Sequence, residues 1–166
     1  MDLSETRRAA AEAVHRLVDR RETLATAESL TGGLVAATVV EIPGVSAVFR
    51  GGLVVYATDL KAALAGVPEG LLAERGPVDA DVAAALAAGA RARCGADWGV
   101  ATTGVAGPDP QDGKPVGLVY IAVRGPGHTA VRELRLGGNR EAVRTESVTR
   151  VLQLLSETLQ EASKPA

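Results

Sequence analysis

The sequence predicts a single three-layer α/β/α domain with a mixed, largely parallel sheet, and three observations lead to this fold class. Segments with apolar residues at helical spacing alternate with short apolar runs, an order typical of parallel strands joined by helices. Near the end of the chain, two strand-like segments are separated by a tight turn, which adds an antiparallel hairpin. A length of 166 residues suits one domain with a complete core, so the predicted domain spans residues 1–166.

The first elements are a helix, a strand and a second helix. Apolar residues at helical spacing predict a helix over 4–20, and Ser4 is placed to cap its first turn. The apolar run 23–27 predicts a short strand. The next helix is expected to begin near Thr31 and to end before Pro43, because proline cannot continue a helix.

A strand and two short helices follow. The Val-rich segment 51–57 predicts a buried strand, since continuous apolar runs are typical of strands covered on both faces. Thr58 or Asp59 is placed to cap a short helix that carries Lys61. The segment 68–76 predicts another short helix.

The remaining elements complete the sheet and end in a helix. Asp79 is placed to cap a longer helix over 81–95. In chain order, the expected elements are then a strand over 97–104, a loop rich in glycine and proline over 105–115, a strand over 116–124, a turn at 125–128, an edge strand over 129–136 and a helix from about Arg140 to the chain end.

The composition argues against nucleic acid as the main partner. The formal net charge is -2, so the chain lacks the basic field that neutralises a phosphate backbone. Cys94 is the single cysteine, which excludes an internal disulfide and fits a reducing compartment. No basic leader and no run of about 18 apolar residues occurs, so we expect a cytoplasmic protein with neither signal peptide nor membrane span.

Histidine and metal chemistry have little support in this sequence. His15 lies inside the first expected helix and His128 lies in the hairpin turn, so a Ser-His-Asp triad is not expected. The histidines are far apart and Cys94 has no second cysteine, so we expect neither a protein-held metal nor a cofactor.

The stretch TAESLTGG, residues 26–33, is the first candidate site. Ser29, Thr31, Gly32 and Gly33 stand where a strand gives way to a helix, whose unpaired N–H groups favour an anion. The pattern is not a P-loop, because no lysine precedes a Ser or Thr here. From the residues alone, Ser29 is a helix cap, a phosphate contact or a nucleophile, and the glycines equally suit close packing of helix on sheet.

Tyr56 and Lys61 extend this candidate site. Tyr56 ends one expected strand and Lys61 follows it, and the carboxyl ends of parallel strands meet at one edge of a sheet, near Ser29. To act as a base, Lys61 needs its pKa lowered from about 10.4 to about 7–8 by desolvation or a neighbouring cation. The alternative is an ordinary solvated lysine on a helix.

Four motifs, in this order and with these intervals, resemble a known family. They are TAESLTGG, GGLVVYATDLK, TTGVAGPDP followed by GKPVGLVYIAV, and GGNREAVR. They are similar to the C-terminal domain of the competence/damage-inducible CinA proteins, and the resemblance covers nearly the whole chain. Stand-alone members of that family are nicotinamide mononucleotide amidohydrolases.

The resemblance implies a reaction and three catalytic residues. The reaction is hydrolysis of the carboxamide of nicotinamide mononucleotide to nicotinic acid mononucleotide and ammonia, a step in recycling pyridine nucleotides that needs no metal. By resemblance, Ser29 is the nucleophile and Lys61 is its general base. Tyr56 supplies a hydroxyl that positions this pair or shuttles its proton.

The resemblance also implies contacts with the substrate. Thr103 and Gly104 stand where the family has a small hydroxyl residue and a glycine beside the substrate. Thr31, Gly32 and Gly33 belong to the candidate binding turn, and backbone N–H groups near Gly32, Gly33 or Gly104 are candidates for stabilising an oxyanion.

Two arginines are candidates for the phosphate of the nucleotide. Arg140 and Arg144 lie one helical turn apart at the start of the last expected helix, so they share a face. The alternative is surface pairing with Glu141 or Glu146, and spacing does not decide which arginine takes the phosphate.

Three positions depart from the family pattern. Leu30 replaces a usual cysteine, Asn139 replaces a usual aspartate, and Thr102–Thr103 replaces a pair that contains serine. None of these changes removes a catalytic candidate. The competing hypothesis is a catalytically weak nucleotide-binding module in a competence or DNA-damage response. The family further implies a homodimer or a higher homo-oligomer.

Overall fold

Five strands form one mixed sheet in the order β2-β1-β3-β4-β5. The strands are β1 (Leu24–Glu28), β2 (Phe49–Val54), β3 (Trp98–Gly104), β4 (Leu118–Gly125) and β5 (His128–Arg135). β1 pairs in parallel with β2 and with β3, whereas β4 is antiparallel to both of its neighbours. The mixed sheet and its antiparallel edge hairpin are therefore confirmed. The computed structural model describes residues 3–163, so the ends of the predicted 1–166 domain lie outside the described residues.

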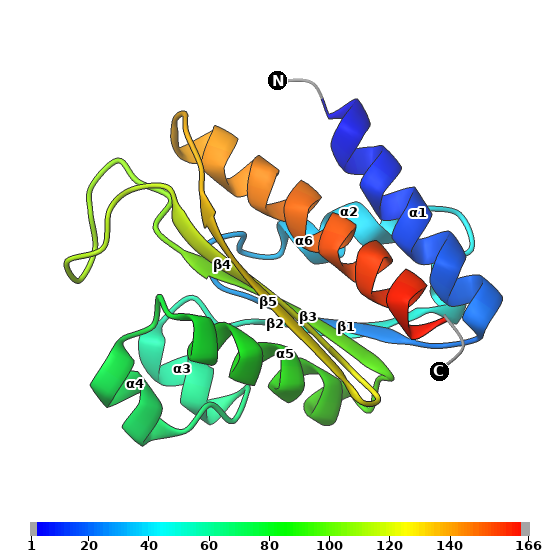
Figure 1. The fold of residues 1–166 in the computed structure, drawn as a ribbon, viewed down its shortest axis with the longest axis horizontal. Helices are drawn as coiled ribbons and strands as arrows, with labels where there is room; N and C mark the ends of the chain where they lie inside the picture. Colours follow the sequence, from blue (N-terminus) through cyan, green and yellow to red (C-terminus); the bar gives the residue numbers. More distant parts are fainter. Residues whose placement is uncertain (1–2, 164–166) are drawn as a thin grey trace.

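Helices cover both faces of the sheet, which confirms the predicted three layers (Figure 1). One face carries α1 (Ser4–Arg20), α2 (Leu34–Val40) and α6 (Arg140–Ala162). The other face carries α3 (Thr58–Ala63), α4 (Glu69–Arg75) and α5 (Ala80–Cys94). Between α2 and β2 lies a single 3₁₀ turn, η1 (Val45–Ala47). No helix within residues 3–163 is both long enough and apolar enough to cross a bilayer.

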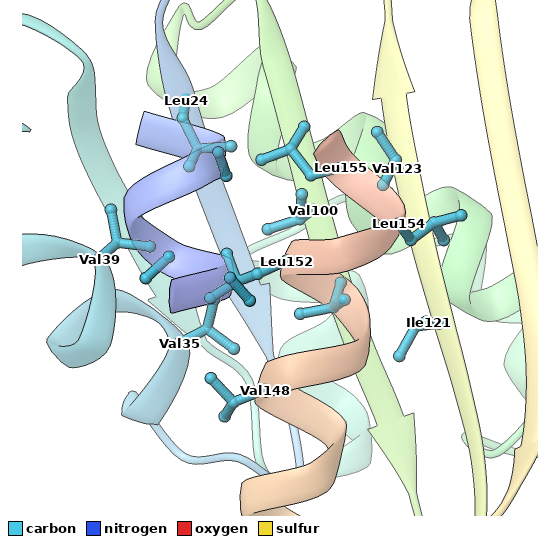
Figure 2. Close-up of a cluster of buried hydrophobic side chains, with 14 of the residues drawn as sticks. Leu24, Val35, Val39, Val100, Ile121, Val123, Val148, Leu152, Leu154 and Leu155 are labelled. Atoms are coloured by element: carbon cyan, nitrogen blue, oxygen red, sulfur yellow. The ribbon is translucent and has the colours of Figure 1, made fainter. Parts of the chain in front are cut away.

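The two faces of the sheet have different cores. Beneath α6, Val148, Leu152 and Leu155 point toward the sheet and pack in one buried cluster with side chains of β1, β3 and β4 (Figure 2). Beneath α5 the buried side chains are mostly alanine, so helix and sheet approach closely. A Cβ atom on Gly99 of β3 would lie 2.1 Å from the Ala87 carbonyl oxygen, which explains the glycine there.

Two predicted helix caps are wrong. Leu3 occupies the N-cap position of α1, and its carbonyl accepts the first helical bond from Arg7, so Ser4 already lies inside the helix. Ala57 occupies the N-cap position of α3 in an extended conformation, which excludes Thr58 and Asp59 as caps. Neither N-cap residue has a side chain that can accept a hydrogen bond.

Asp79 caps α5 as predicted. Its carboxylate accepts from the N–H groups of Asp81 at 2.8 Å and Val82 at 3.2 Å. Gly95 ends the same helix in a left-handed conformation, with φ of 61°.

The second helix and the second strand also differ from prediction. The helix begins at Leu34 instead of near Thr31, because Gly32 and Gly33 have φ of 58° and 105° and form a turn. β2 is an edge strand and not a buried one: its residues alternate between half-buried and exposed, and Val54 is 48% exposed. An unbroken apolar run does not distinguish these two environments.

Candidate active site

The carboxyl ends of β1, β2 and β3 meet at one edge of the sheet, because these three strands are parallel. Ser29 directly follows β1, Tyr56 and Lys61 follow β2, and Gly104 ends β3. All four line one cavity of about 350 Å³, a size that suits a small ligand. The prediction that Ser29, Tyr56 and Lys61 meet at this edge is confirmed.

Lys61 directly contacts the candidate nucleophile. Its Nζ lies 2.9 Å from Ser29 Oγ, 2.8 Å from the Val55 carbonyl oxygen and 3.3 Å from the Tyr56 carbonyl oxygen. Lys61 Nζ donates to these three oxygens, which match the three N–H groups of an ammonium. After loss of a proton, the lone pair of the neutral amine is directed at Ser29 Oγ and can accept from its hydroxyl.

The surroundings of Lys61 make its neutral form more accessible. The side chain is 1% exposed, and within residues 3–163 it forms no ion pair. Burial lowers the pKa of Lys61 from 10.5 to about 8, since an ammonium group loses its hydration there. Desolvation is the cause, and the alternative of a solvated surface lysine is therefore wrong.

Glu28 holds the start of α2 from within β1. Its buried carboxylate accepts from the N–H groups of Val35 at 2.7 Å and Ala36 at 3.0 Å. These donors are the ones that an external anion would use, so the protein's own carboxylate fills the start of this helix. Gly33 is the N-cap residue of α2, and Glu28, not Ser29, supplies the side-chain acceptor for its first turn.

The turn between β1 and α2 depends on two glycines with positive φ. Both Gly32 and Gly33 adopt left-handed conformations that other residues rarely take. The Gly32 N–H donates to the Ser29 carbonyl at 3.0 Å, so it is already engaged within the turn. The turn exposes Ser29 Oγ to the cavity and keeps Thr31 buried, with the Thr31 hydroxyl 2.8 Å from that of Thr102.

Thr103 and Gly104 line the far wall of the cavity. The Thr103 hydroxyl donates to the Pro77 carbonyl at 2.7 Å, which fixes the side chain. A Cβ on Gly104 would lie 2.8 Å from the Leu118 carbonyl oxygen, so close packing on β4 requires glycine at this position.

Arg140 bridges two loops beside the cavity. Its Nη1 donates to the Gly107 carbonyl at 2.6 Å, and its Nη2 donates to the Tyr56 hydroxyl at 3.0 Å. The Tyr56 side chain is 59% exposed and its hydroxyl contacts Arg140, whereas its backbone carbonyl contacts Lys61. Arg140 forms no ion pair within residues 3–163, so its charge is available to an anion in the cavity.

Arg144 lies elsewhere. Its Nε donates to the Leu30 carbonyl at 2.9 Å and its Nη2 to the Thr31 carbonyl at 3.2 Å. The residue lines a separate groove of about 790 Å³ and not the cavity that holds Ser29. Surface pairing of either arginine with Glu141 or Glu146 is not present among the described ion pairs, where Glu146 contacts Arg150.

Several site residues were not foreseen. Asp109 and Gln111, in the loop between β3 and β4, line the cavity, and this loop projects beyond the sheet (Figure 1). Asp109 belongs to the motif TTGVAGPDP, but no role was predicted for it, and Gln111 lies outside the four motifs. Asn139 caps α6 by accepting from the Ala142 N–H at 2.9 Å, a role that an aspartate at this position fills equally well. Within the described part of the chain, no three metal-ligating side chains are grouped.

Comparison with known proteins agrees with the fold. The family model of the CinA C-terminal domain matches residues 6–159. A CinA-like protein of Frankia casuarinae is 54% identical over 143 residues, which are 86% of this chain and 33% of that protein. The crystal structure of the competence/damage inducible protein CihA from Agrobacterium tumefaciens has a TM-score of 0.90 at 34% identity, covering 96% of this chain and 99% of that chain.

A second solved structure is similarly close. The competence damage-inducible protein A of Klebsiella pneumoniae subsp. pneumoniae has a TM-score of 0.90 at 32% identity, covering 93% of this chain and 97% of that chain. The chain spans about a third of the length of the curated relatives it matches, 33% in the proteins of Frankia casuarinae and Geobacter sulfurreducens. On the extent of these matches, the chain belongs to the CinA C-terminal domain family.

Proposed function

We propose that the protein hydrolyses the carboxamide of nicotinamide mononucleotide, giving nicotinic acid mononucleotide and ammonia. The observation that carries this proposal is the 2.9 Å contact between Ser29 Oγ and Lys61 Nζ at the wall of a cavity. A serine hydroxyl becomes an effective nucleophile beside a base, and a lysine is a base when desolvation lowers its pKa. Burial lowers the pKa of Lys61 to about 8.

The proposed chemistry has two stages. Ser29 Oγ attacks the carboxamide carbon, and its proton passes to Lys61 Nζ. Collapse of the tetrahedral intermediate breaks the C–N bond, and the leaving nitrogen takes that proton from Lys61 and departs as ammonia. Water then attacks the acyl ester and gives its proton to Lys61, which returns it to Ser29 as the ester bond breaks.

Arg140 is the proposed ligand of the substrate phosphate. It lines the cavity, carries a positive charge and is held by two neutral acceptors, Gly107 O and Tyr56 Oη. A guanidinium group with no carboxylate partner is suited to bind a phosphate through charge-assisted hydrogen bonds. Thr103 and Gly104 of the far wall are proposed to flank the nicotinamide ring.

A second candidate function is nucleotide binding without efficient turnover. The solved relatives are named for competence and damage and not for a reaction. In this hypothesis the same cavity and Arg140 hold a nucleotide, and a competence or damage response uses the bound state.

Ammonia release from nicotinamide mononucleotide by metal-free protein tests the first function. The wild type is expected to turn over, and Ser29→Ala and Lys61→Met are expected to lose at least about a thousandfold in kcat while remaining folded. Ser46→Ala, which changes an exposed serine outside the cavity, is the matched control. Calorimetric binding of the nucleotide without ammonia release would instead support the binding module.

Self-association stays a prediction. A homodimer or higher homo-oligomer is expected to sediment above the monomer mass of 17.0 kDa at micromolar concentration. A monomer at that concentration would contradict it.

A further inference from the structure

We propose that Arg144 is a positioning residue, which holds the turn carrying Ser29 in its reactive shape and does not contact the substrate. This inference rests on the proposed role of Ser29 as a nucleophile. It gives Arg144 a role other than gripping the phosphate.

The contacts of Arg144 are directed at the backbone of the turn. Nε and Nη2 donate to the carbonyl oxygens of Leu30 and Thr31, at 2.9 Å and 3.2 Å. These are the two residues that follow Ser29. The guanidinium group also packs on the turn, since Nη2 lies 3.6 Å from the position of a Cβ on Gly32.

The turn needs such support. Leu30 is 3% exposed, so without Arg144 its carbonyl would lack both water and a protein donor among the described residues, whereas the Thr31 carbonyl also accepts from the Leu34 N–H at 2.9 Å. Gly32 and Gly33 directly follow, and glycine gives the backbone many alternative conformations. Removing the two hydrogen bonds therefore frees the segment that carries Ser29.

The direction of the carbonyls has a chemical consequence. In a trans peptide the C=O and N–H groups point in opposite directions, so Arg144 fixes the peptide plane between Leu30 and Thr31. The next plane toward Ser29 contains the Leu30 N–H. In α/β hydrolases the N–H of the residue after the nucleophile stabilises the oxyanion. By holding the Leu30 carbonyl, Arg144 thus positions both Ser29 and the Leu30 N–H donor.

Arg144 lines the 790 Å³ groove and is absent from the cavity that holds Ser29. Its removal should therefore change the rate of bond formation at Ser29 more than it changes substrate affinity. This split separates Arg144 from Arg140, which lines the cavity.

Phenylmethanesulfonyl fluoride tests the inference without relying on the natural substrate. Ser29 Oγ bonds to the sulfur, fluoride leaves, and the hydroxyl proton passes to Lys61, so the labelling rate measured by mass spectrometry reports on the reactivity of Ser29 and its base. Arg144→Met keeps the side-chain length without donors, and Arg144→Lys keeps the charge. Arg150→Met makes the same change on the same helix, at a residue paired with Glu146.

We expect Arg144→Met to slow labelling and kcat by about 10–100-fold, with the KM for nicotinamide mononucleotide within about twofold. Arg144→Lys should be intermediate and Arg150→Met unchanged. Guanidinium ion at millimolar concentration should restore part of the labelling rate in Arg144→Ala, which a general loss of folding would not permit. If Arg144→Met fails to fold, Arg144→Lys and the guanidinium rescue of Arg144→Ala test the positioning role instead.

The outcomes separate this inference from the proposed function. Wild-type labelling in Arg144→Met, or a raised KM with unchanged kcat, would overturn the positioning role even if the wild type hydrolyses nicotinamide mononucleotide. If labelling depends on Arg144 but the wild type does not hydrolyse nicotinamide mononucleotide, the positioning role is supported and nicotinamide mononucleotide is excluded as the substrate. No labelling of Ser29 in the wild type would overturn the nucleophile and the inference together.

Discussion

The amino group of Lys61 and the hydroxyl of Ser29 lie 2.9 Å apart, although they come from segments that follow two different strands. The parallel pairing of β1 and β2 brings the segments together. Lys61 also donates hydrogen bonds to the carbonyls of Val55 and Tyr56, and burial lowers its pKa to about 8. If Lys61 is the base of the proposed reaction, protonation of this one amine affects both reactivity and stability.

Activity should increase with pH. Only the neutral form of Lys61 accepts a proton from Ser29, and its pKa is about 8. We expect kcat/KM for nicotinamide mononucleotide to rise about tenfold in all between pH 7 and the level reached above that pKa. Measurement from pH 7 upward avoids titration of the substrate phosphate near pH 6. A level profile between pH 7 and pH 9.5 would exclude Lys61 as the base.

Stability should also depend on Lys61. Its pKa is about 8 in the folded protein and 10.5 ordinarily, so between these values the unfolded chain binds more protons. From pH 8 to pH 10.5, the free energy of unfolding of the wild type should therefore rise by about 3 kcal/mol more than that of Lys61→Met. Below pH 8 the cost of burying the charge is fully present. Urea unfolding at several pH values measures this free energy for the wild type, for Lys61→Met and for the control Lys114→Met. If the free energies of wild type and Lys61→Met change in parallel with pH, the prediction is refuted.

Arg140→Met should weaken binding of the phosphate. Loss of a charge-assisted contact is expected to raise the Kd for nicotinamide mononucleotide about 10–100-fold, measured by calorimetry on the Ser29→Ala background. Nicotinamide riboside, which has no phosphate, should lose less than about threefold, because it makes no such contact. Equal losses for both ligands would mean that Arg140 shapes the cavity through Tyr56 and Gly107 instead.

Glu28→Gln should destabilise the fold. The carboxylate accepts two N–H groups at the start of α2, and an amide places its own N–H against one of those donors. We expect a loss of about 2 kcal/mol in the free energy of unfolding, compared with about 1 kcal/mol for Asn139→Ala at the start of α6. Urea unfolding at neutral pH gives both values. A loss for Glu28→Gln no larger than that for Asn139→Ala would argue against this cap.

The layers and the position of the site were predictable from patterns within the sequence. Helical spacing located α6, and the apolar runs located all five strands approximately. Because the carboxyl ends of parallel strands lie at one edge of a sheet, the order of strands along the sequence was enough to predict that Ser29, Tyr56 and Lys61 lie close together. The resemblance to the CinA C-terminal domain then supplied roles that spacing could not.

Features that depend on contacts between distant segments were not predictable. The sequence spacing places Arg140 and Arg144 on the same face of a helix. Their different hydrogen-bond partners arise because each packs against a different loop. β2 lies at an edge because, among residues 3–163, only β1 pairs with it, and its apolar composition does not reveal this. Glu28 turns back to the start of α2 because Gly32 and Gly33 change the chain direction, and no local propensity encodes that return.

The edge position of β2 gives the two halves of the site unequal resistance to local opening. β1 is held by a strand on each side, whereas β2 has one neighbour and leads directly into the short helix that carries Lys61. Detachment of β2 and α3 would carry the base away while Ser29 keeps its place. Amide hydrogens of β2 should therefore exchange faster than those of β1, and heat should abolish turnover several degrees before the domain as a whole melts.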